Sequence, residues 1–549
     1  MRRLATRKSL LFVVMALTLA VGFAGGSLMR NSASTTRASS LPYKNYAALV
    51  SYIQAHHKAP FDRDNVSYSG GNAIGAARGH NKTFSATPYS GGGGNVKVNQ
   101  DRNPWPKAEL GAAVDPTNGN NYVVMENDFR ENYDHMFYHV STNGGRSWTD
   151  DSMVGGADPV TGFIPLTFQS DPGVAFDSFG HSYVSTITGN LIFDFNNGYI
   201  NSDTEIEVAE GFAHGRYTSL LPTPIDDQPC NGTFTVFNCP ATLDKPLITV
   251  DNVPGSPHKG TIYVYYTLFC NGTGTSGTGP CTDGSATVPA FSSAILESHS
   301  AGWGLPFSTP ALVSGSTLVQ EQFSDLVVDS HGTPHMFFDD FSSPFPAVNM
   351  YESTLTSTGW VVSSSPVASF SYTGLNNINW FFRDSGTVAP GCGISGDTAY
   401  CAFSATQIGS GPTASTPSVY VAVVNTTTAA SSVNRVNSDK FLDGKHHFFP
   451  WATVTPNGNV YVGWYDDRND KFSTKVQYFV GKSTNGGKTF PTQVPVSDTS
   501  FNPCVGFPGC GFFGDYTQLV SGPDGVVHAA WSDTRDGASM QVYTQSITW

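Results

Sequence analysis

Three short segments place an acid and an arginine at the same spacing. They are Asp128-Phe129-Arg130, Asp466-Asp467-Arg468 and Asp533-Thr534-Arg535. The guanidinium of Arg offers a planar fork that matches a carboxylate with two parallel hydrogen bonds, so three converging Arg side chains would hold an acidic group. The alternative is that each Asp pairs with its own Arg, or with backbone, and simply fastens its loop.

Each Asp-x-Arg segment directly follows the second strand of a repeated unit. The unit has an apolar strand, a turn rich in Asp, Asn, Pro or Gly, and a second strand rich in Tyr, Val and Trp. The first strands of the clear copies begin near residues 112, 174, 247, 326, 452 and 519, and a weak copy surrounds Gly393 to Phe403. Repetition of one supersecondary unit along a chain is the mark of a repeat architecture.

The repeated unit is typical of the inner hairpin of a propeller blade. A lone blade cannot bury both of its faces, so blades stack radially and close into a ring. We therefore predict an all-β fold, a six- or seven-bladed β-propeller with four-stranded antiparallel blades. The count favours seven, and six would follow if one copy is partial. Charged residues are only 13% of the chain, against about 25% in a typical soluble domain, and Gly is abundant.

A second repeated phrase sets the orientation of the blades. Ser141-Thr142-Asn143-Gly144-Gly145-Arg146-Ser147-Trp148 returns as Ser483-Thr484-Asn485-Gly486-Gly487-Lys488-Thr489-Phe490, each time after a strand. Asn-Gly-Gly supplies residues that tolerate a positive φ, so the phrase indicates a tight turn between the third and fourth strands. The Asp-x-Arg segments then lie on the opposite face of the ring, where the first strands begin.

This phrase resembles the Asp-box (BNR) repeat, Ser-x-Asp-x-Gly-x-Thr-Trp, of the sialidase-like propeller superfamily. Both copies have Asn where the family usually has Asp. The stretch from Tyr461 to Asp470 is also similar to bacterial exported proteins described as exo-alpha-sialidase-like, and the resemblance covers about 105–549. It implies a glycoside hydrolase that acts on an acidic extracellular glycan, because sialidases hold the carboxylate of sialic acid with three Arg.

The resemblance also suggests which residues would do the chemistry. Arg130, Arg468 and Arg535, with Asp128, are expected to bind substrate. A glycosidase needs a proton donor and a base or nucleophile, and sialidases use a Tyr paired with a Glu. For these roles we expect Asp466, Asp533 and Tyr516. Further candidates on the same face are Asp171, Asp244, Asp325, Asp515, Glu126, Tyr133 and Tyr465.

The alternative is a non-catalytic propeller at the cell surface that binds a glycan or a protein. The Arg-Ile-Pro motif of catalytic sialidases does not occur in the sequence, and no Tyr–Glu pair can be placed by motif. The two functions therefore both stay open on the sequence.

The N-terminal region is typical of an exported protein. Arg2, Arg3, Arg7 and Lys8 precede an apolar run over 10–24 and then small residues. This layout predicts a signal peptide or an uncleaved anchor over 1–27, followed by a low-complexity tether over 28–104 with one short helix at 43–57. The propeller is expected over 105–549. We expect a secreted or cell-surface protein that touches a membrane only through an uncleaved anchor.

The net charge of the chain excludes one class of binding partner. The formal net charge is −14, which argues against nucleic-acid binding, because phosphate contacts need clustered Lys and Arg.

Eight Cys fall into four close pairs, and in an exported chain these favour disulfides: 230 with 239, 270 with 281, 392 with 401, and 504 with 510. We expect an extracellular glycan or glycoprotein as partner and no cofactor or metal; a structural Ca²⁺ would suit the fold, but no loop matches a calcium pattern.

Overall fold

The computed structural model describes most of the chain from residue 94 onward. It covers 94–549 except 131–133, 153–167, 190, 195–198, 213–222, 234–235, 239, 273–278, 285, 373, 376–378, 381, 383–390 and 508–509. The expected signal segment, the short helix and most of the expected tether therefore lie outside the described residues, as does Tyr133.

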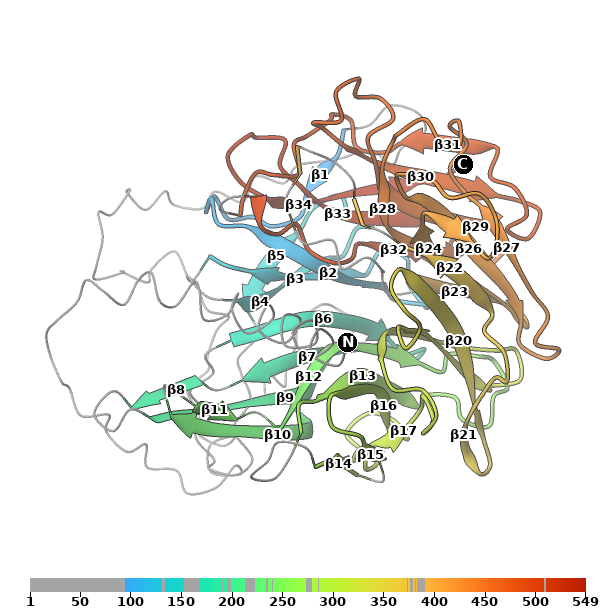
Figure 1. Cartoon of the computed structure of the whole chain (residues 1–549). Coiled ribbons are helices and arrows are strands. Elements are labelled where there is room, and N and C mark those ends of the chain that lie inside the picture. Colours follow the sequence, from blue (N-terminus) through green and yellow to red (C-terminus); the bar gives the residue numbers. More distant parts are fainter. Residues whose placement is uncertain are drawn as a thin grey trace, which may run out of the picture.

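The described chain forms seven antiparallel blade sheets arranged around a ring, together with one two-stranded hairpin, which confirms a seven-bladed propeller (Figure 1). Blade 1 consists of β2 (Lys107–Val114), β3 (Tyr122–Asp128), β4 (His135–Ser141) and β5 (Thr149–Ser152). Blade 2 consists of β6 (Phe168–Phe176), β7 (His181–Gly189), β9 (Tyr199–Phe212) and β10 (Thr223–Thr233), with the additional strands β8 (Leu191–Asp194) and β11 (Val236–Asn238). Blade 3 consists of β12 (Ala241–Val250), β13 (Ile262–Cys270), β16 (Ser292–Ser300) and β17 (Ala311–Leu312), beside the hairpin β14 (Cys281–Asp283) and β15 (Ala286–Val288).

The remaining four blades follow the same order from the inside outward. Blade 4 consists of β18 (Glu321–Val328), β19 (Pro334–Asp340), β20 (Ala347–Thr356) and β22 (Ala368–Ser371), with the additional strands β21 (Gly359–Val362) and β25 (Gln407–Ile408). Blade 5 consists of β23 (Gly391–Ser395), β24 (Thr398–Ala405), β26 (Ser418–Asn425) and β27 (Ser431–Arg435), and blade 6 of β28 (His447–Val454), β29 (Val460–Asp466), β30 (Gln477–Ser483) and β31 (Thr492–Pro495). Blade 7 consists of β32 (Gln518–Ser521), β33 (Val527–Asp533), β34 (Gln541–Ile547) and β1 (Val96–Lys97).

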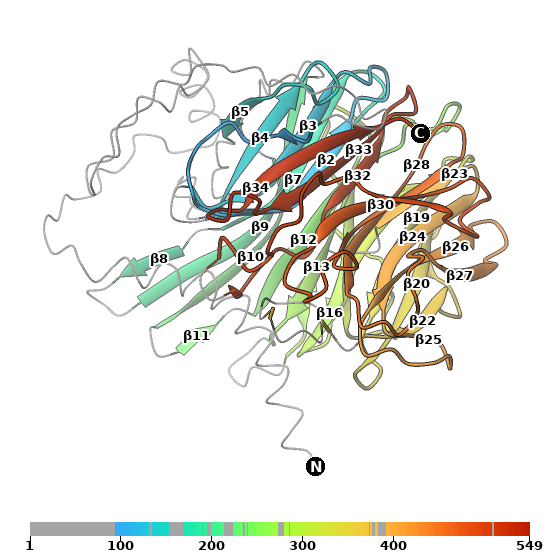
Figure 2. The ribbon, with the colours of Figure 1, turned by 90° about the horizontal axis from the view of Figure 1, so that it is seen from above.

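The ring is closed by strands from both ends of the described chain. β1 pairs with β34, with Val96 opposite Thr544 and Lys97 opposite Tyr543. Val98 extends the contact by donating its N–H to Val542 O at 2.8 Å, and its side chain is fully buried. The red strands β33 and β34 consequently lie beside the blue blade 1 (Figure 2). Residues 96 and 97, which fall within the range expected as a tether, thus form the outer strand of the last blade.

The two copies of the Asn-Gly-Gly phrase form the same turn between the third and fourth strands. In each copy a Ser hydroxyl accepts the N–H of the second Gly, Ser141 from Gly145 at 2.8 Å and Ser483 from Gly487 at 3.0 Å. Both of these Gly residues have a positive φ, at 83° and 70°. The closing aromatics Trp148 and Phe490 are buried.

The innermost strands share a β-bulge near their first residues. Five non-glycine residues with φ between 50° and 57° lie in or beside the register shifts of β2, β6, β12, β18 and β28: Glu109, Asp171, Lys245, Phe323 and Phe449. A bulge re-aims its side chain, and a positive φ is uncommon outside Gly. We call the face where the innermost strands begin the entry face, because these bulges lie on it.

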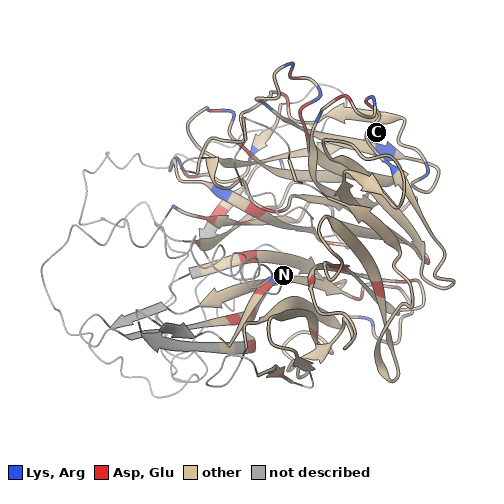
Figure 3. Ribbon diagram, in the orientation of Figure 1, with Lys and Arg blue, Asp and Glu red and all other residues tan. Residues whose placement is uncertain are grey.

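Three of the four expected disulfides are present, joining Cys270 with Cys281, Cys392 with Cys401, and Cys504 with Cys510. The pair 230 and 239 lies outside the side chains that the structure describes. Over the described residues every regular element is a strand, and no helix suited to crossing a membrane is found there. Charged residues are scattered around the ring (Figure 3).

Candidate functional site

The three Asp-x-Arg segments adopt one conformation, at the entry-face ends of β3, β29 and β33. In each, the Asp accepts the backbone N–H of the Arg at 2.8 Å through one carboxylate oxygen. The other oxygen lies 2.6 Å from an Nη2 of the same Arg in all three segments. Each Arg is thus paired with the Asp two residues before it.

The guanidinium groups are also fixed by two further contacts that recur. Each lies over an aromatic ring of the third strand of its own blade: Arg130 over Phe137 at 3.8 Å, Arg468 over Phe479 at 4.7 Å and Arg535 over Tyr543 at 4.0 Å. Each also meets an Asp in the segment that leads into its blade: Asp101 at 3.2 Å, Asp439 at 3.5 Å and Asp498 at 2.6 Å. The three Arg therefore do not converge on one pocket; each fastens its own blade to the chain that enters it.

Asp466 and Asp533 are enclosed by these contacts. Both are buried, and each accepts a further hydrogen bond from a Trp of its own strand, from Trp464 Nε1 at 2.7 Å and from Trp531 Nε1 at 2.9 Å. Both oxygens of each carboxylate are used by groups of the same blade, so these contacts fasten the loop. Catalysis by Asp466 and Asp533 stays a prediction that this geometry does not support.

A different group of charged side chains meets on the entry face, around Lys245. Its Nζ lies 3.0 Å from Glu109 Oε1, 2.9 Å from Asp171 Oδ2 and 3.0 Å from Asp515 Oδ2. An ammonium has three hydrogens to donate, so all three are used. The carboxylates come from blades 1 and 2 and from the residues before β32, so the bulges of separate blades build one cluster, the Lys245 cluster.

Asp134 extends this cluster through a serine. Ser170 Oγ lies 2.8 Å from Asp134 Oδ2 and 2.9 Å from Asp171 Oδ1. Asn127 completes the surroundings, because its Nδ2 donates to Glu109 Oε2 at 2.6 Å and its Oδ1 accepts the N–H of Asp171 at 2.7 Å. Asp134 is partly buried, whereas Asp171 is 3% exposed.

The surroundings shift the pKa values of Asp134 and Asp171 in opposite directions. Burial raises the pKa of Asp134 well above its ordinary value, and the nearby charge of Asp171 adds to the rise. Burial also acts to raise the pKa of Asp171, but the Lys245 ammonium and hydrogen bonds from Asn127 and Ser170 outweigh it and hold that pKa below its ordinary value. Of the two neighbouring carboxyl groups, Asp134 therefore holds its proton more strongly than Asp171 does.

Tyr516 is the one predicted catalytic residue that lies at the Lys245 cluster. Lys245 Nζ is 5.4 Å from the centre of its ring. Burial, together with the charges of Asp171 and Glu109, raises the pKa of Tyr516 well above its ordinary value, which disfavours a phenolate. Of the further candidates, Asp171 and Asp515 belong to the cluster, and Asp244 lies at its edge, where it accepts from Gln322 Nε2 at 3.1 Å.

The other candidates are held away from the Lys245 cluster. Asp325 accepts from Tyr265 OH and from Cys392 N, both at 2.7 Å, and burial raises its pKa to about 7. Glu126 pairs with His139 Nε2 at 2.6 Å inside blade 1. Tyr465 OH accepts the N–H of Ser532 at 3.0 Å, and both groups are buried.

The bulges differ in chemistry from one side of the ring to the other. They carry charged residues in blades 1 to 3 and phenylalanines, Phe323 and Phe449, in blades 4 and 6. Phe449 packs against Phe448 at 5.1 Å between ring centres, and Phe448 packs in turn against Trp380 at 5.8 Å and Phe382 at 5.8 Å. An aromatic side of the entry face thus adjoins a polar side.

Sequence patterns did not single out Glu109, Asp134, Ser170 or Lys245. A usable signal was present, because Pro172, Pro246 and Pro450 each follow a bulged residue directly. Pro inside a strand is confined largely to edges and bulges. Its recurrence just before three apolar inner strands could have located the bulges, although not the partners of their side chains.

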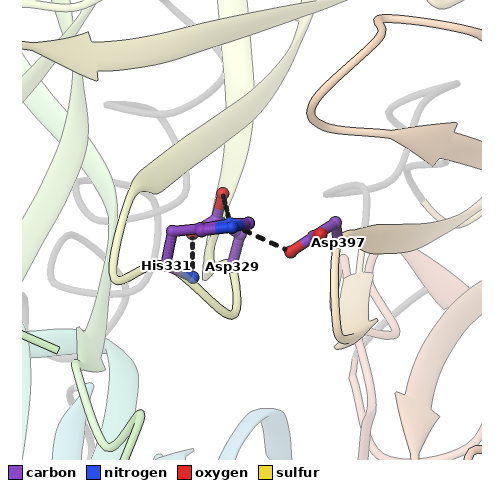
Figure 4. Close-up of side chains that lie close together, drawn as sticks. All are labelled: Asp329, His331 and Asp397. Atoms are coloured by element: carbon purple, nitrogen blue, oxygen red, sulfur yellow. Dashed lines mark hydrogen bonds and ion pairs between the residues drawn. The ribbon is translucent and has the colours of Figure 1, made fainter. Parts of the chain in front are cut away.

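A second group of polar residues lies on the face opposite the entry face. Atoms of Asp329, His331 and Asp397 that could bind a metal all lie within 4.8 Å of one another (Figure 4). They come from the β18–β19 turn and from the β23–β24 turn of the neighbouring blade. A search of the residues that the structure describes yields this one group.

Comparisons with known proteins do not assign this chain to a family. No family model matches the chain, and no curated protein matches it. Among solved structures, it is similar to an alpha-L-arabinanase of Penicillium chrysogenum (9% identity, 84% of this chain and 98% of the other, TM-score 0.39) and to the NanB sialidase of Streptococcus pneumoniae (9%, 83% and 98%, TM-score 0.37). A protein of unknown function from Dyadobacter fermentans gives 11% identity over 69% of this chain and 94% of the other, with a TM-score of 0.40. Similarities this distant carry no argument about activity.

Proposed function

We propose that this protein is an exported, glycan-active propeller whose reaction centre is the pair Asp134 and Asp171. The observation that carries the proposal is the shared Ser170 hydroxyl between a carboxyl group of raised pKa and a carboxylate of lowered pKa. Glycoside hydrolysis needs two such carboxyl groups in different protonation states.

The spacing of the pair fits one stereochemical outcome. The two oxygens that contact Ser170 Oγ are each within 2.9 Å of it, so they are at most about 6 Å apart. Retaining glycosidases have carboxyl groups about 5–5.5 Å apart, and inverting enzymes about 6.5–9.5 Å. We therefore propose hydrolysis with retention of configuration.

The reaction would proceed in two displacements. Asp134 donates its proton to the glycosidic oxygen while Asp171 attacks the anomeric carbon, so the C–O bond breaks and an ester to Asp171 forms. Water then transfers a proton to the Asp134 carboxylate. The water oxygen attacks the anomeric carbon, the ester bond to Asp171 breaks, and Asp171 leaves as a carboxylate. Lys245 positions Asp171 and keeps it ionised, and Asn127 holds it through its backbone N–H.

The charge of the centre favours a neutral glycan over an acidic one. One Lys faces the carboxylates of Glu109, Asp171 and Asp515, and none of the three predicted Arg joins them. A sugar carboxylate would meet repulsion there. Neutral sugars instead present hydroxyls, which donate hydrogen bonds to carboxylates.

Three disulfides support the export that the N-terminal sequence predicts, because disulfides persist in oxidising compartments. The extracellular location and the glycan partner are part of this proposal.

A panel of fluorogenic glycosides tests the activity directly. We expect turnover of a neutral pentoside or hexoside and none of a sialoside, with retention seen by proton NMR of the first product. With an unactivated oligosaccharide of the same sugar as substrate, Asp134→Asn and Asp171→Asn should each lower turnover at least 100-fold while the protein stays folded by circular dichroism; Asp524→Asn, an exposed acid on the other face, serves as control. Full activity in both variants would refute the proposed pair.

One observation favours the second candidate function, a non-catalytic binding propeller. Glu109, Asp171 and Asp515 are each at most 3% exposed and all bind Lys245, as in a buried structural ion cluster. That function predicts glycan binding on an array without turnover, unchanged by Asp171→Asn.

A further inference from the structure

We propose that Asp329, His331 and Asp397 form a binding site for a divalent transition metal of the Zn²⁺ type that joins blades 4 and 5. The three side chains point toward one another across the gap between two turns (Figure 4). The site lies on the face opposite the entry face, so it is independent of the proposed reaction centre.

Two of the three distances between donor atoms are close to those around one zinc ion, and all three donors lie within 4.8 Å of one another. His331 Nδ1 lies 3.3 Å from Asp397 Oδ1 and 3.7 Å from Asp329 Oδ2. Zinc binds His nitrogen and carboxylate oxygen at about 2.0–2.2 Å in a tetrahedron, which places neighbouring donors about 3.4 Å apart. The side chains therefore need little movement to bind a shared ion.

Equivalent turns in three other blades show what is unusual here. Asp115, Asp177 and Asp251 open the same strand-to-strand turn, and each accepts a backbone N–H through Oδ1, as Asp329 does from His331 at 2.9 Å. In those turns Oδ2 accepts a short hydrogen bond within the turn or from the following strand: from Asn121 at 3.0 Å, from Tyr183 at 2.8 Å and from Ser256 at 2.5 Å. In blade 2, Asp177 Oδ2 also lies 2.7 Å from His181 Nδ1.

In blade 4 the corresponding oxygen faces two histidines at longer range. Asp329 Oδ2 is 3.3 Å from His335 Nε2 and 3.7 Å from His331 Nδ1, and Asp397 approaches from blade 5. A histidine also meets the turn aspartate in blade 2, so blade 4 is distinguished by Asp397, a carboxylate of the neighbouring blade that meets the same histidine. Such a set of nitrogen and oxygen donors suits a cation better than a turn.

The surrounding contacts hold the donors in place. Ser330 donates its hydroxyl to Asp397 Oδ1 at 2.5 Å, and its N–H bonds to Gly396 O at 3.2 Å, so the two turns are already joined. His335 contacts both Asp329 Oδ2 and, at 2.8 Å, Glu352 Oε1, which is the outer-shell pattern that orients a metal-binding carboxylate. His331 is 67% exposed, which leaves a path for the ion.

The donor set determines which metal is expected. An imidazole nitrogen with two carboxylate oxygens suits Zn²⁺, whereas Ca²⁺ takes six to eight oxygen ligands and gains little from a nitrogen. Three protein ligands leave one position of a tetrahedron to water. Because its ligands come from two blades, a bound ion should stabilise the native ring.

Isothermal titration of the full-length chain, made without a polyhistidine tag, tests the site. We expect one equivalent of Zn²⁺ to bind at this site and to raise the melting temperature, with no comparable rise from Ca²⁺. His331→Ala and Asp397→Asn should each weaken this binding at least tenfold and remove the thermal shift. His258→Ala, an exposed histidine in the corresponding turn of blade 3, should leave both unchanged.

Substitution with Co²⁺ provides a readout of the ligands. The visible absorption of tetrahedral Co²⁺ should appear in the wild type and in His258→Ala and disappear in His331→Ala. Zinc affinity and thermal shift equal in the wild type, His331→Ala and Asp397→Asn would overturn the proposal. Binding that only His258→Ala weakens would overturn it as well.

Discussion

Asp134 and Asp171 share a single hydroxyl, that of Ser170, at 2.8 Å and 2.9 Å. A hydroxyl has one hydrogen, so it cannot donate to two ionised carboxylates at once. Both contacts are satisfied when Ser170 donates to Asp171 and a protonated Asp134 donates to Ser170. The hydrogen-bond geometry is thus consistent with one protonated carboxyl group in the pair, and the opposite pKa shifts identify Asp134 as the one that holds its proton more strongly.

The first prediction concerns the pH dependence of the proposed hydrolysis. Asp134 must be protonated to act as acid, so activity should fall as pH rises through its raised pKa. Asp171 must be ionised, so activity should fall only when pH drops through its lowered pKa. A profile of kcat/KM against pH should therefore be bell-shaped, with its acid limb below the ordinary range of Asp.

The control for this profile is a substrate with a better leaving group. Asp134→Asn should spare activated aryl glycosides more than unactivated ones and should remove the alkaline limb. An alkaline limb that persists in Asp134→Asn would assign that ionisation to another residue.

The second prediction is that the Lys245 cluster depends on its single cation. Lys245→Met leaves Glu109, Asp171 and Asp515 buried without their counter-ion, and breaking a buried ion pair costs about 3–5 kcal/mol of unfolding free energy. Without Lys245, burial acts to raise the pKa of Asp171 above its unfolded value. The variant should therefore regain stability as pH falls and lose it as pH rises, measured by urea unfolding at several pH values.

Lys488→Met is the matched control, because Lys488 is an exposed lysine of the Asn-Gly-Gly turn. It should unfold within about 0.5 kcal/mol of the wild type. Equal stability of the two variants at neutral pH would show that the cluster does not contribute to folding.

The third prediction separates the structural role of the Asp-x-Arg segments from substrate binding. Arg468→Ala leaves Asp466 buried without its arginine and removes one partner of Asp439, so the free energy of unfolding should fall by about 3 kcal/mol. KM for any substrate should stay unchanged. A double-mutant cycle with Asp439→Asn should show coupling, because both residues belong to one network.

Arg146→Ala, an exposed arginine on the opposite face, is the control for charge removal alone. A KM raised tenfold in Arg468→Ala, with stability intact, would instead support the sequence-based prediction that this Arg holds substrate.

The sequence was sufficient for the parts of this fold that depend on local pattern. Strand, turn and strand recur as units, so the seven blades could be counted, and the Ser141 and Ser483 turns set which ends share a face. Three disulfides were predictable because their partners are close neighbours in the chain.

The candidate site was not predictable, because its contacts are set by the closure of the ring. Lys245 and Glu109 are separated by 136 residues and meet only when bulges of two blades turn toward each other. A bulge changes the direction of one side chain and leaves the apolar alternation around it intact, so it produces no periodic signal. The Asp-x-Arg segments could be recognised in the sequence because they recur at equivalent positions of three blades. Such a recurrence indicates a role in the structure of each blade, and it does not identify a binding site.

The last prediction concerns the strand that closes the ring. β1 has two residues, too few to show alternation, yet it supplies the outer strand of blade 7 through Val96 and Lys97. Val98→Asp places a charge at a fully buried position beside Val542, whose carbonyl accepts the Val98 N–H. We expect the ring to open at blade 7, with a lower melting temperature and loss of hydrogen-exchange protection in β34 before other blades. Val361→Asp, at an exposed position of β21, should leave both measurements unchanged, and uniform loss of protection across all blades in Val98→Asp would contradict closure at this strand.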